Sequence, residues 1–155
     1  MKTLVIGWGN RIAGDDAVGL AAAEIVADRL KQPDVEVITT SYAGFRLAER
    51  TLDIDRVVVL DAHVDSDGAK DVSVSRIRSQ DLGRPSATRH DGCLVDAFRA
   101  LAAFERERLP GEIVLMSVPI DPPTEWSEEM TPAALAAAER LAGAALRELE
   151  GIPVG

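Results

Sequence analysis

The sequence holds three side chains, far apart along the chain, whose types and positions suit metal chemistry: Asp16, Asp61 and His90. Asp16 stands in the glycine-containing loop GWGNRIAGDDAVG, Asp61 follows the apolar run RVVVL, and His90 precedes a helical pattern in SATRHDGCLVDAF. Two carboxylates and one imidazole suit a borderline divalent metal such as nickel, zinc or cobalt better than calcium or magnesium. Three side chains would leave coordination positions open for a substrate group or for water.

Each of these residues also has a purely structural alternative. Asp16 and its neighbour Asp15 could cap the following helix, because a carboxylate there binds the first free amides and offsets the helix dipole. Asp61 could be a cap or a turn former, and His90 could be an ordinary surface histidine. His63 lies two residues after Asp61, so in an extended strand it points the same way and could supply an additional ligand.

The cysteine content bears on both chemistry and location. Cys93 lies three residues after His90, which raises the alternative of a cysteine–histidine nucleophile pair. Leu94 and the spacing to Phe98 instead favour Cys93 as a small packed core residue. As the single cysteine of the chain, Cys93 excludes an intramolecular disulfide and suits a reducing compartment. Because the opening MKTLVIGWG has no signal-peptide pattern, we expect a cytoplasmic protein.

The glycine loop does not fit the two common nucleotide-binding patterns. The dinucleotide fingerprint requires glycine where Ile12 stands, and the phosphate loop requires a lysine, but none lies between Lys2 and Lys31. We therefore interpret Gly7 and Gly9 as residues that permit a tight turn. A nucleotide-binding domain is accordingly disfavoured.

Charge and length exclude several classes of partner. The 155-residue chain has a formal net charge of −9, whereas nucleic-acid binding depends on neutralising phosphates with Lys and Arg. No apolar run approaches the ~20 residues needed to cross a bilayer. The length suits one domain, and we find no internal repeat or boundary, so residues 1–155 are treated as a single domain. We expect neither a nucleic acid nor a membrane as partner.

Apolar β-branched runs alternate with helical patterns along the chain. We expect strands at residues 3–7, 34–39, 56–62, 71–77 and 112–118, and helices at about 16–31, 44–51, 91–108 and 131–150. This alternation predicts a three-layer α/β domain with helices on both faces of a mostly parallel five-stranded sheet. Residues 71–77 follow the preceding strand too closely for a helical crossover, which predicts an antiparallel edge strand. Ligands of such sheets bind beyond the carboxyl ends of the strands.

The ends of the last helix carry their own signals. Thr131 is a good N-cap and Pro132 fits the first helical turn. Gly151 and Pro153 follow the helix, so we expect the tail after Glu150 to fray.

At this point the sequence resembles the hydrogenase maturation endopeptidases, whose opening reads roughly G-x-G-N-x-x-x-x-D-[DE]-x-x-G, as does VIGWGNRIAGDDAVG here. The likeness continues in TTSYAGFRLAE, in VVVLDAHVD and in TRHDGCLVDAFRAL. It ends with VLMSVPIDPPTEWSEEMTPAALAAAERL and covers nearly the whole chain. No single motif is decisive, but their order and spacing together are fairly specific. The resemblance implies a phosphorylase/hydrolase-like α/β/α fold.

The resemblance also implies a function. Members of that family remove a short C-terminal extension from the large-subunit precursor of a [NiFe]-hydrogenase after nickel has been inserted. Two acidic residues and a histidine approach that nickel, and by motif these are Asp16, Asp61 and His90 here, which would bind the metal and carry the catalysis. The metal would come with the precursor, so no permanent cofactor is expected, and we expect a monomer. The alternative is a non-catalytic relative that holds a metal or a precursor without cleaving it.

Two further expectations follow for the neighbourhood of this site. Asp15 would cap the helix or steady the loop while Asp16 faces the metal. The loop PIDPPTEWSEEM is a candidate wall of the site, and Trp126 in it is either an exposed anchor or a packed loop aromatic. Which group attacks the peptide bond is left open.

Overall fold

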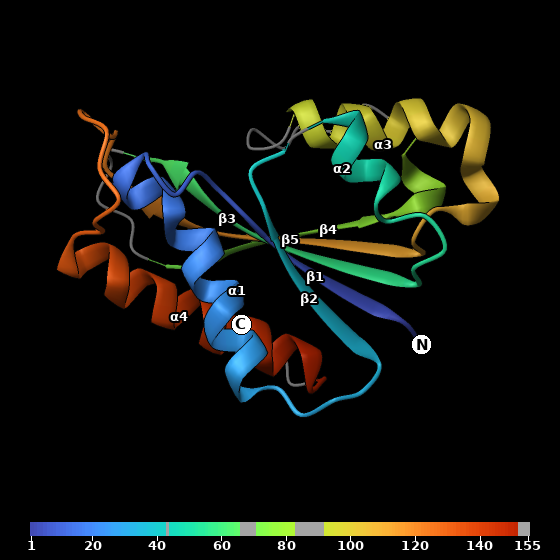
Figure 1. Cartoon of the computed structure of the whole chain (residues 1–155). Helices are drawn as coiled ribbons and strands as arrows, with labels where there is room; N and C mark the ends of the chain where they lie inside the picture. The colour runs from blue at the N-terminus through green and yellow to red at the C-terminus, as the bar shows by residue number, and fades with distance from the viewer. Residues whose placement is uncertain (43, 66–70, 83–91, 152–155) are drawn as a thin grey trace.

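The computed structural model describes residues 1–42, 44–65, 71–82 and 92–151 (Figure 1). They form one five-stranded sheet in the order β2-β1-β3-β5-β4. The strands are β1 (Thr3–Trp8), β2 (Val35–Thr40), β3 (Arg56–Val64), β4 (Ser73–Arg78) and β5 (Glu112–Ile120). β2, β1, β3 and β5 pair in parallel, and β4 pairs antiparallel with β5 at the edge of the sheet. The predicted sheet, including its antiparallel edge strand, is confirmed.

Helices cover both faces of the sheet, as expected for three layers (Figure 1). One face packs against α1 (Val18–Arg29) and α4 (Pro132–Leu149), and the other against α2 (Phe45–Glu49) and α3 (Gly92–Glu105). The alternation of β3 divides its side chains between two cores: Val58 and Leu60 lie in the core under α1 and α4, whereas Val57 and Val59 lie in the core under α2 and α3. All four are buried, which explains why β3 reads as a continuous apolar run.

Several element boundaries differ from those expected. β3 and β5 each continue two residues beyond the predicted ends at 62 and 118, reaching Val64 and Ile120. The first long helix begins at Val18, because Gly14–Ala17 forms a separate 3-10 turn. The third helix ends at Glu105 and is followed by a 3-10 turn at Arg106–Arg108. Strand β4 begins at Ser73, two residues later than expected.

The start and end of α4 follow the sequence signals. The Thr131 hydroxyl accepts a hydrogen bond from the Ala134 backbone N–H at 3.2 Å, with Pro132 in the first turn. Gly151 follows the helix with a φ of 76°, the left-handed conformation that favours glycine. The tail that we expected to fray lies outside the described residues beyond Gly151.

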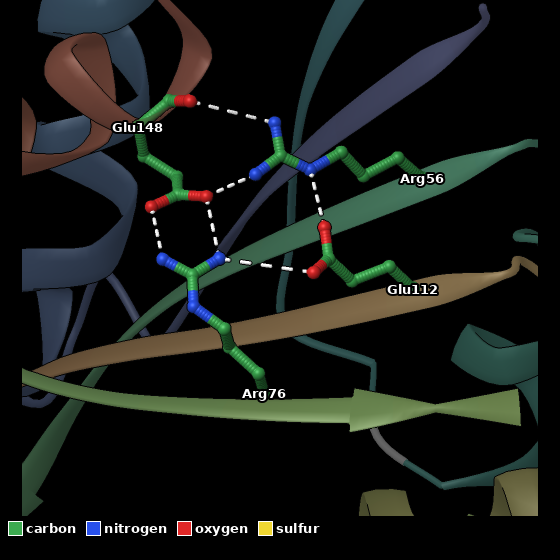
Figure 2. A network of polar contacts seen from close by, with 4 residues as sticks. All are labelled: Arg56, Arg76, Glu112 and Glu148. Atoms are coloured by element: carbon green, nitrogen blue, oxygen red, sulfur yellow. Dashed lines mark hydrogen bonds and ion pairs between the residues drawn. The ribbon is translucent and has the colours of Figure 1, made fainter. Parts of the chain in front are cut away.

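A charged network fixes the carboxyl end of α4 to the amino edge of the sheet (Figure 2). Glu148 of α4 is only 5% exposed, and Arg76 of β4 donates to both of its carboxylate oxygens, at 2.7 and 2.6 Å. Arg56 at the start of β3 also contacts Glu148, and it donates to Glu112 of β5 at 2.9 Å. The network lies at the amino-terminal ends of the parallel strands, whereas the candidate site lies at their carboxyl ends. Because it joins α4 to three strands, it links a helix layer to the sheet.

Among the helices in the described ranges, none combines the length and the apolar character needed to cross a bilayer.

Candidate functional site

The candidate site lies at the carboxyl edge of the sheet, where the first turn of α1 packs directly on strand ends. A Cβ atom on Gly19 would overlap the carbonyl oxygens of Trp8 and Leu60, and one on Gly9 would overlap the carbonyl oxygen of Asp16. These glycines therefore permit close packing of the Asp16 loop against β1 and β3. Neither Gly9 nor Gly7 has a positive φ, unlike Gly14 at 56°, so the expected tight-turn role belongs to Gly14.

Asp16 is half-buried in the 3-10 turn ahead of α1. Its Oδ2 atom accepts a hydrogen bond from the Asn10 backbone N–H at 3.2 Å, across the loop. Burial raises the pKa of the Asp16 carboxyl above its ordinary value, and the Asn10 N–H partly opposes that rise. No side chain caps the 3-10 turn or α1, whose N-cap residues are Ala13 and Ala17, so the hydrogen-bonding part of the capping alternative for Asp16 is wrong. Asp16 does lie in the first turn, where a carboxylate offsets the helix dipole, so that part of the alternative holds.

Asp15 steadies the loop by a contact with a distant segment. Its Oδ1 atom accepts from the Thr131 backbone N–H at 2.9 Å, and its Oδ2 atom accepts from the Thr131 hydroxyl at 2.9 Å. Asp15 thus bonds the residue before α4 and not the amides of its own helix. Of the two roles expected for Asp15, loop support is confirmed and capping is wrong.

A second set of contacts joins the same two loops. The Gly14 N–H donates to the Ser127 carbonyl at 2.8 Å, and the Ser127 N–H donates to the Ile12 carbonyl at 2.8 Å. Ala13 and Ser127 form an isolated parallel β-bridge between these bonds. The loop that carries Asp16 and the loop that follows β5 are therefore one hydrogen-bonded unit.

Asp61 lies near the end of β3, half-buried, opposite Ser117 of β5 in the strand register. Its Oδ1 atom accepts from the N–H of the next residue, Ala62, at 2.7 Å. Strand alternation puts Asp61 on the face shared with Val57 and Val59, which is the face covered by α2 and α3.

His63 lies on that same face and contacts two residues that sequence reasoning did not single out. Its Nδ1 atom is 2.9 Å from the Ser117 hydroxyl oxygen, and its Nε2 atom is 4.0 Å from a carboxylate oxygen of Asp65. The His63 side chain is 11% exposed. A hydroxyl in contact with an imidazole can exchange a proton, so Ser117 belongs on the list of groups at this edge. Only the register of β3 against β5 reveals the pair, because the two residues are 54 positions apart.

His90 lies outside the described residues, and so does the side chain of Cys93. The alternative of a cysteine–histidine pair therefore also falls outside what the structure describes. The helix that follows His90, α3, begins at Gly92 and packs on the sheet face to which Asp61 belongs. Within the described part of the chain, no three His, Cys, Asp or Glu side chains form a group that could hold a metal ion. The ligand set of Asp16, Asp61 and His90, with or without His63, therefore stays a prediction.

An open groove adjoins this edge of the sheet. Its volume is about 1000 Å³, and it is lined by the end of β5, by the segment that follows β5 and by the first turns of α4, together with Gly14, Asp15 and Asp65. The loop PIDPPTEWSEEM, which we expected to form a wall of the site, lines this groove. Trp126 in that loop is 76% exposed, which decides between its two expected roles: it is not a packed aromatic.

No protein-family model matches the sequence, and no curated protein matches it either. Solved structures do match its fold. The hydrogenase maturating endopeptidase HybD from E. coli superposes with a TM-score of 0.73 at 21% identity, covering 97% of this chain and 93% of that one. An endopeptidase from Escherichia coli, solved in solution, gives a TM-score of 0.73 at 25% identity, covering 98% and 95%. The [NiFe] hydrogenase maturation protease HybD from Thermococcus kodakarensis gives 0.69 at 21% identity, covering 96% and 99%. The chain thus has, over almost its full length, the fold of the hydrogenase maturation proteases, the family that its sequence motifs resemble.

Proposed function

We propose that the protein is an endopeptidase that removes a C-terminal extension from a nickel-loaded [NiFe]-hydrogenase large-subunit precursor. The observation that carries the proposal is the position of Asp16 and Asp61. Asp16 follows β1 and Asp61 lies near the end of the neighbouring parallel strand β3, at the carboxyl edge of a sheet whose fold is shared with hydrogenase maturation proteases. In proteins built on open α/β sheets, ligands and substrates bind at this edge of the sheet.

The strand register supports a shared site for the two carboxylates. β1 and β3 pair in parallel with Gly7 opposite Leu60, so Asp61 follows at the level where β1 ends. The Asp16 loop returns to the same level, because the Asp16 carbonyl lies against Gly9. His90 would join them from the segment before α3, and the three would approach the nickel that the precursor carries.

The chemistry follows from that arrangement. The precursor's nickel would polarise the scissile carbonyl or position a water molecule for attack. In our proposal water is the attacking group and a carboxylate takes its proton. The metal belongs to the substrate, and the protein needs no permanent cofactor of its own.

The test is incubation of the purified protein with hydrogenase large-subunit precursors, each prepared with and without nickel. Mass spectrometry should show loss of a C-terminal fragment from a nickel-loaded precursor and no loss without nickel. Stable binding of a loaded precursor with no lost fragment would support the alternative, a non-catalytic binding module. Cleavage of the nickel-free form at the same rate would contradict recognition through the metal.

A further inference from the structure

The groove beside the site combines an apolar floor with an acidic rim. Its buried lining residues are apolar, namely Ile120, Ala134 and Ala137. Prolines 122 and 123 and Met130 extend this apolar lining. The charged residues that line the groove are five carboxylates and one guanidinium: Asp15, Asp65, Asp121, Glu125, Glu129 and Arg140.

Three of these carboxylates are available to a partner. Asp121, Glu125 and Glu129 are exposed, and within the described part of the chain none of their carboxylates forms an ion pair. Asp15 differs from them, because both of its oxygens are bonded to Thr131. The groove therefore carries more negative than positive charge, since Arg140 is the one cation among these lining residues.

Lysine and arginine side chains match both properties. Their methylene stems pack on apolar surface while their charged ends reach carboxylates at the rim. An acidic or purely apolar segment would leave the rim carboxylates desolvated without a partner.

The wall of the groove is held in place before any partner arrives. Prolines 122 and 123 restrict its backbone, and the contacts of Ser127 with the Asp16 loop fix its middle. A pre-ordered wall lowers the entropy cost of binding a flexible peptide. Because the same contacts join the wall to the loop of Asp16, a segment in the groove lies next to the candidate site.

We propose that this groove holds an extended segment of the precursor, adjoining the scissile bond and carrying lysine or arginine side chains. The proposal rests on the proposed function for the identity of the partner. The charge and shape of the groove determine the chemistry of the segment.

The test uses the full-length protein and short fluorescent peptides that differ only in charge. Three otherwise identical, alanine- and glycine-based peptides would carry three lysines, three arginines or three glutamates, and fluorescence anisotropy would measure their dissociation constants. We expect the basic peptides to bind at least about tenfold more tightly than the acidic one, with a difference that shrinks as salt rises. Equal binding of basic and acidic peptides would overturn the proposal.

A matched pair of variants locates the binding. The groove variant carries Asp121→Lys, Glu125→Lys and Glu129→Lys. The control carries Asp28→Lys, Asp34→Lys and Glu107→Lys, which makes the same change in net charge at exposed positions outside the groove. The groove variant should lose most of the affinity for basic peptides and the control should keep most of it. Equal losses would show only an effect of net charge and would overturn the proposal, and the neutral variant Asp121→Asn, Glu125→Gln, Glu129→Gln repeats the test if the lysine variant does not fold.

The outcome separates this inference from the proposed function. In the processing assay the groove variant should raise KM for the precursor with little change in kcat. If no precursor is cleaved by the wild-type protein but basic peptides bind in the groove, the proposed function fails and with it the identity of the partner, whereas the preference of the groove for basic segments stands. If sedimentation instead shows a concentration-dependent dimer that the groove variant abolishes, a second copy of the chain occupies the groove and the proposal is wrong.

Discussion

Asp15 and Thr131 form a two-point contact across 116 residues of sequence, in which both oxygens of the Asp15 carboxylate accept hydrogen bonds from Thr131. The Thr131 hydroxyl donates to Asp15 and accepts from Ala134, so it serves the loop and caps α4 at once. The contact therefore links the loop that carries Asp16 to the helix that lines the groove.

The two residues should be energetically coupled. Thr131→Ala removes an N-cap and should lower the free energy of unfolding by about 1 kcal/mol. Asp15→Ala removes the acceptor of the same hydroxyl, so the double variant should lose less than the sum of the single losses, by at least about 0.5 kcal/mol. Urea unfolding of the four proteins measures this coupling, and losses that add within about 0.3 kcal/mol would show the residues to be independent.

Two glycines offer opposite predictions for the same substitution. Gly19→Ala would force α1 away from the end of β1 and from β3, because a Cβ there overlaps the Trp8 and Leu60 carbonyl oxygens. We expect a loss of stability of about 2 kcal/mol or more and reduced precursor processing, since Asp16 moves with α1. Gly143→Ala meets nothing within 4 Å in α4, so it should raise stability by about 0.5–1 kcal/mol. Thermal and urea unfolding compare the two, and tolerance of Gly19→Ala would contradict the close packing at this edge.

The network of Figure 2 should dominate the electrostatic stability of the chain. Glu148→Ala leaves the guanidinium of Arg56, whose side chain is only 14% exposed, with fewer partners, and we expect a loss of about 3 kcal/mol. Glu24→Ala breaks an exposed ion pair with Arg11 and should cost no more than about 0.5 kcal/mol. Urea unfolding at pH 7 distinguishes the two, and similar losses would show that burial of Glu148 adds nothing.

The same network predicts a pH dependence. Hydrogen bonds from Arg76, with the added positive charge of Arg56, lower the pKa of Glu148 below its ordinary value of 4.5. The unfolded chain therefore binds the proton at higher pH than the folded protein does, and the stabilisation is complete above 4.5 and is lost as pH falls through the lowered pKa. The stability difference between wild type and Glu148→Gln should be constant near neutral pH and narrow in acid. A stability difference that grows in acid would contradict the lowered pKa of Glu148.

The carboxyl of Asp16 should change stability with pH in the direction opposite to that of Glu148. Its negative charge should lower the stability of the folded protein while serving the proposed function. Because burial raises its pKa, the ionised side chain destabilises the folded state at neutral pH, and this penalty vanishes below 3.8, where the carboxyl is protonated in both states. Asp16→Asn keeps an oxygen for the Asn10 N–H, so it should be more stable than wild type at pH 7, equal to it in acid, and inactive on precursor. Unfolding at the two pH values measures the gain, and an Asn variant less stable at pH 7 would contradict the assigned shift.

Ser117 tests which group attacks the peptide bond. If water attacks, Ser117→Ala loses only the contact that orients His63, and processing should fall by less than about tenfold. A serine nucleophile would lose more than about a thousandfold. Single-turnover cleavage of a loaded precursor measures the difference, with Ser79→Ala on the far edge of the sheet as a matched control.

The sequence predicted the sheet and its layers well, because its signals are local. The run from Val57 to Leu60 is apolar on both faces only in a covered parallel sheet, and the short spacing before β4 leaves no room for a crossover helix. Gly14 was missed as the residue of the tight turn, since Gly7, Gly9 and Gly14 look equally suited to a turn until the packing of α1 is known.

The surroundings of the site depended on contacts between distant segments. The pairing of His63 with Ser117 needs the register of two strands, and that of Asp15 with Thr131 needs the approach of two loops. No local pattern encodes either. The Glu148 network is similar, since a glutamate near a helix end looks like a solvated charge until β3 and β4 supply its arginines.

The most direct test of the account is cleavage of one nickel-loaded precursor by Asp16→Asn, Asp61→Asn and His90→Ala, with Asp28→Asn as an exposed control. Each of the three variants should fold and release the C-terminal fragment at least about a hundredfold more slowly than wild type, while the control cleaves normally. Fragment release at the wild-type rate by a double Asp16→Asn, Asp61→Asn variant would contradict the account.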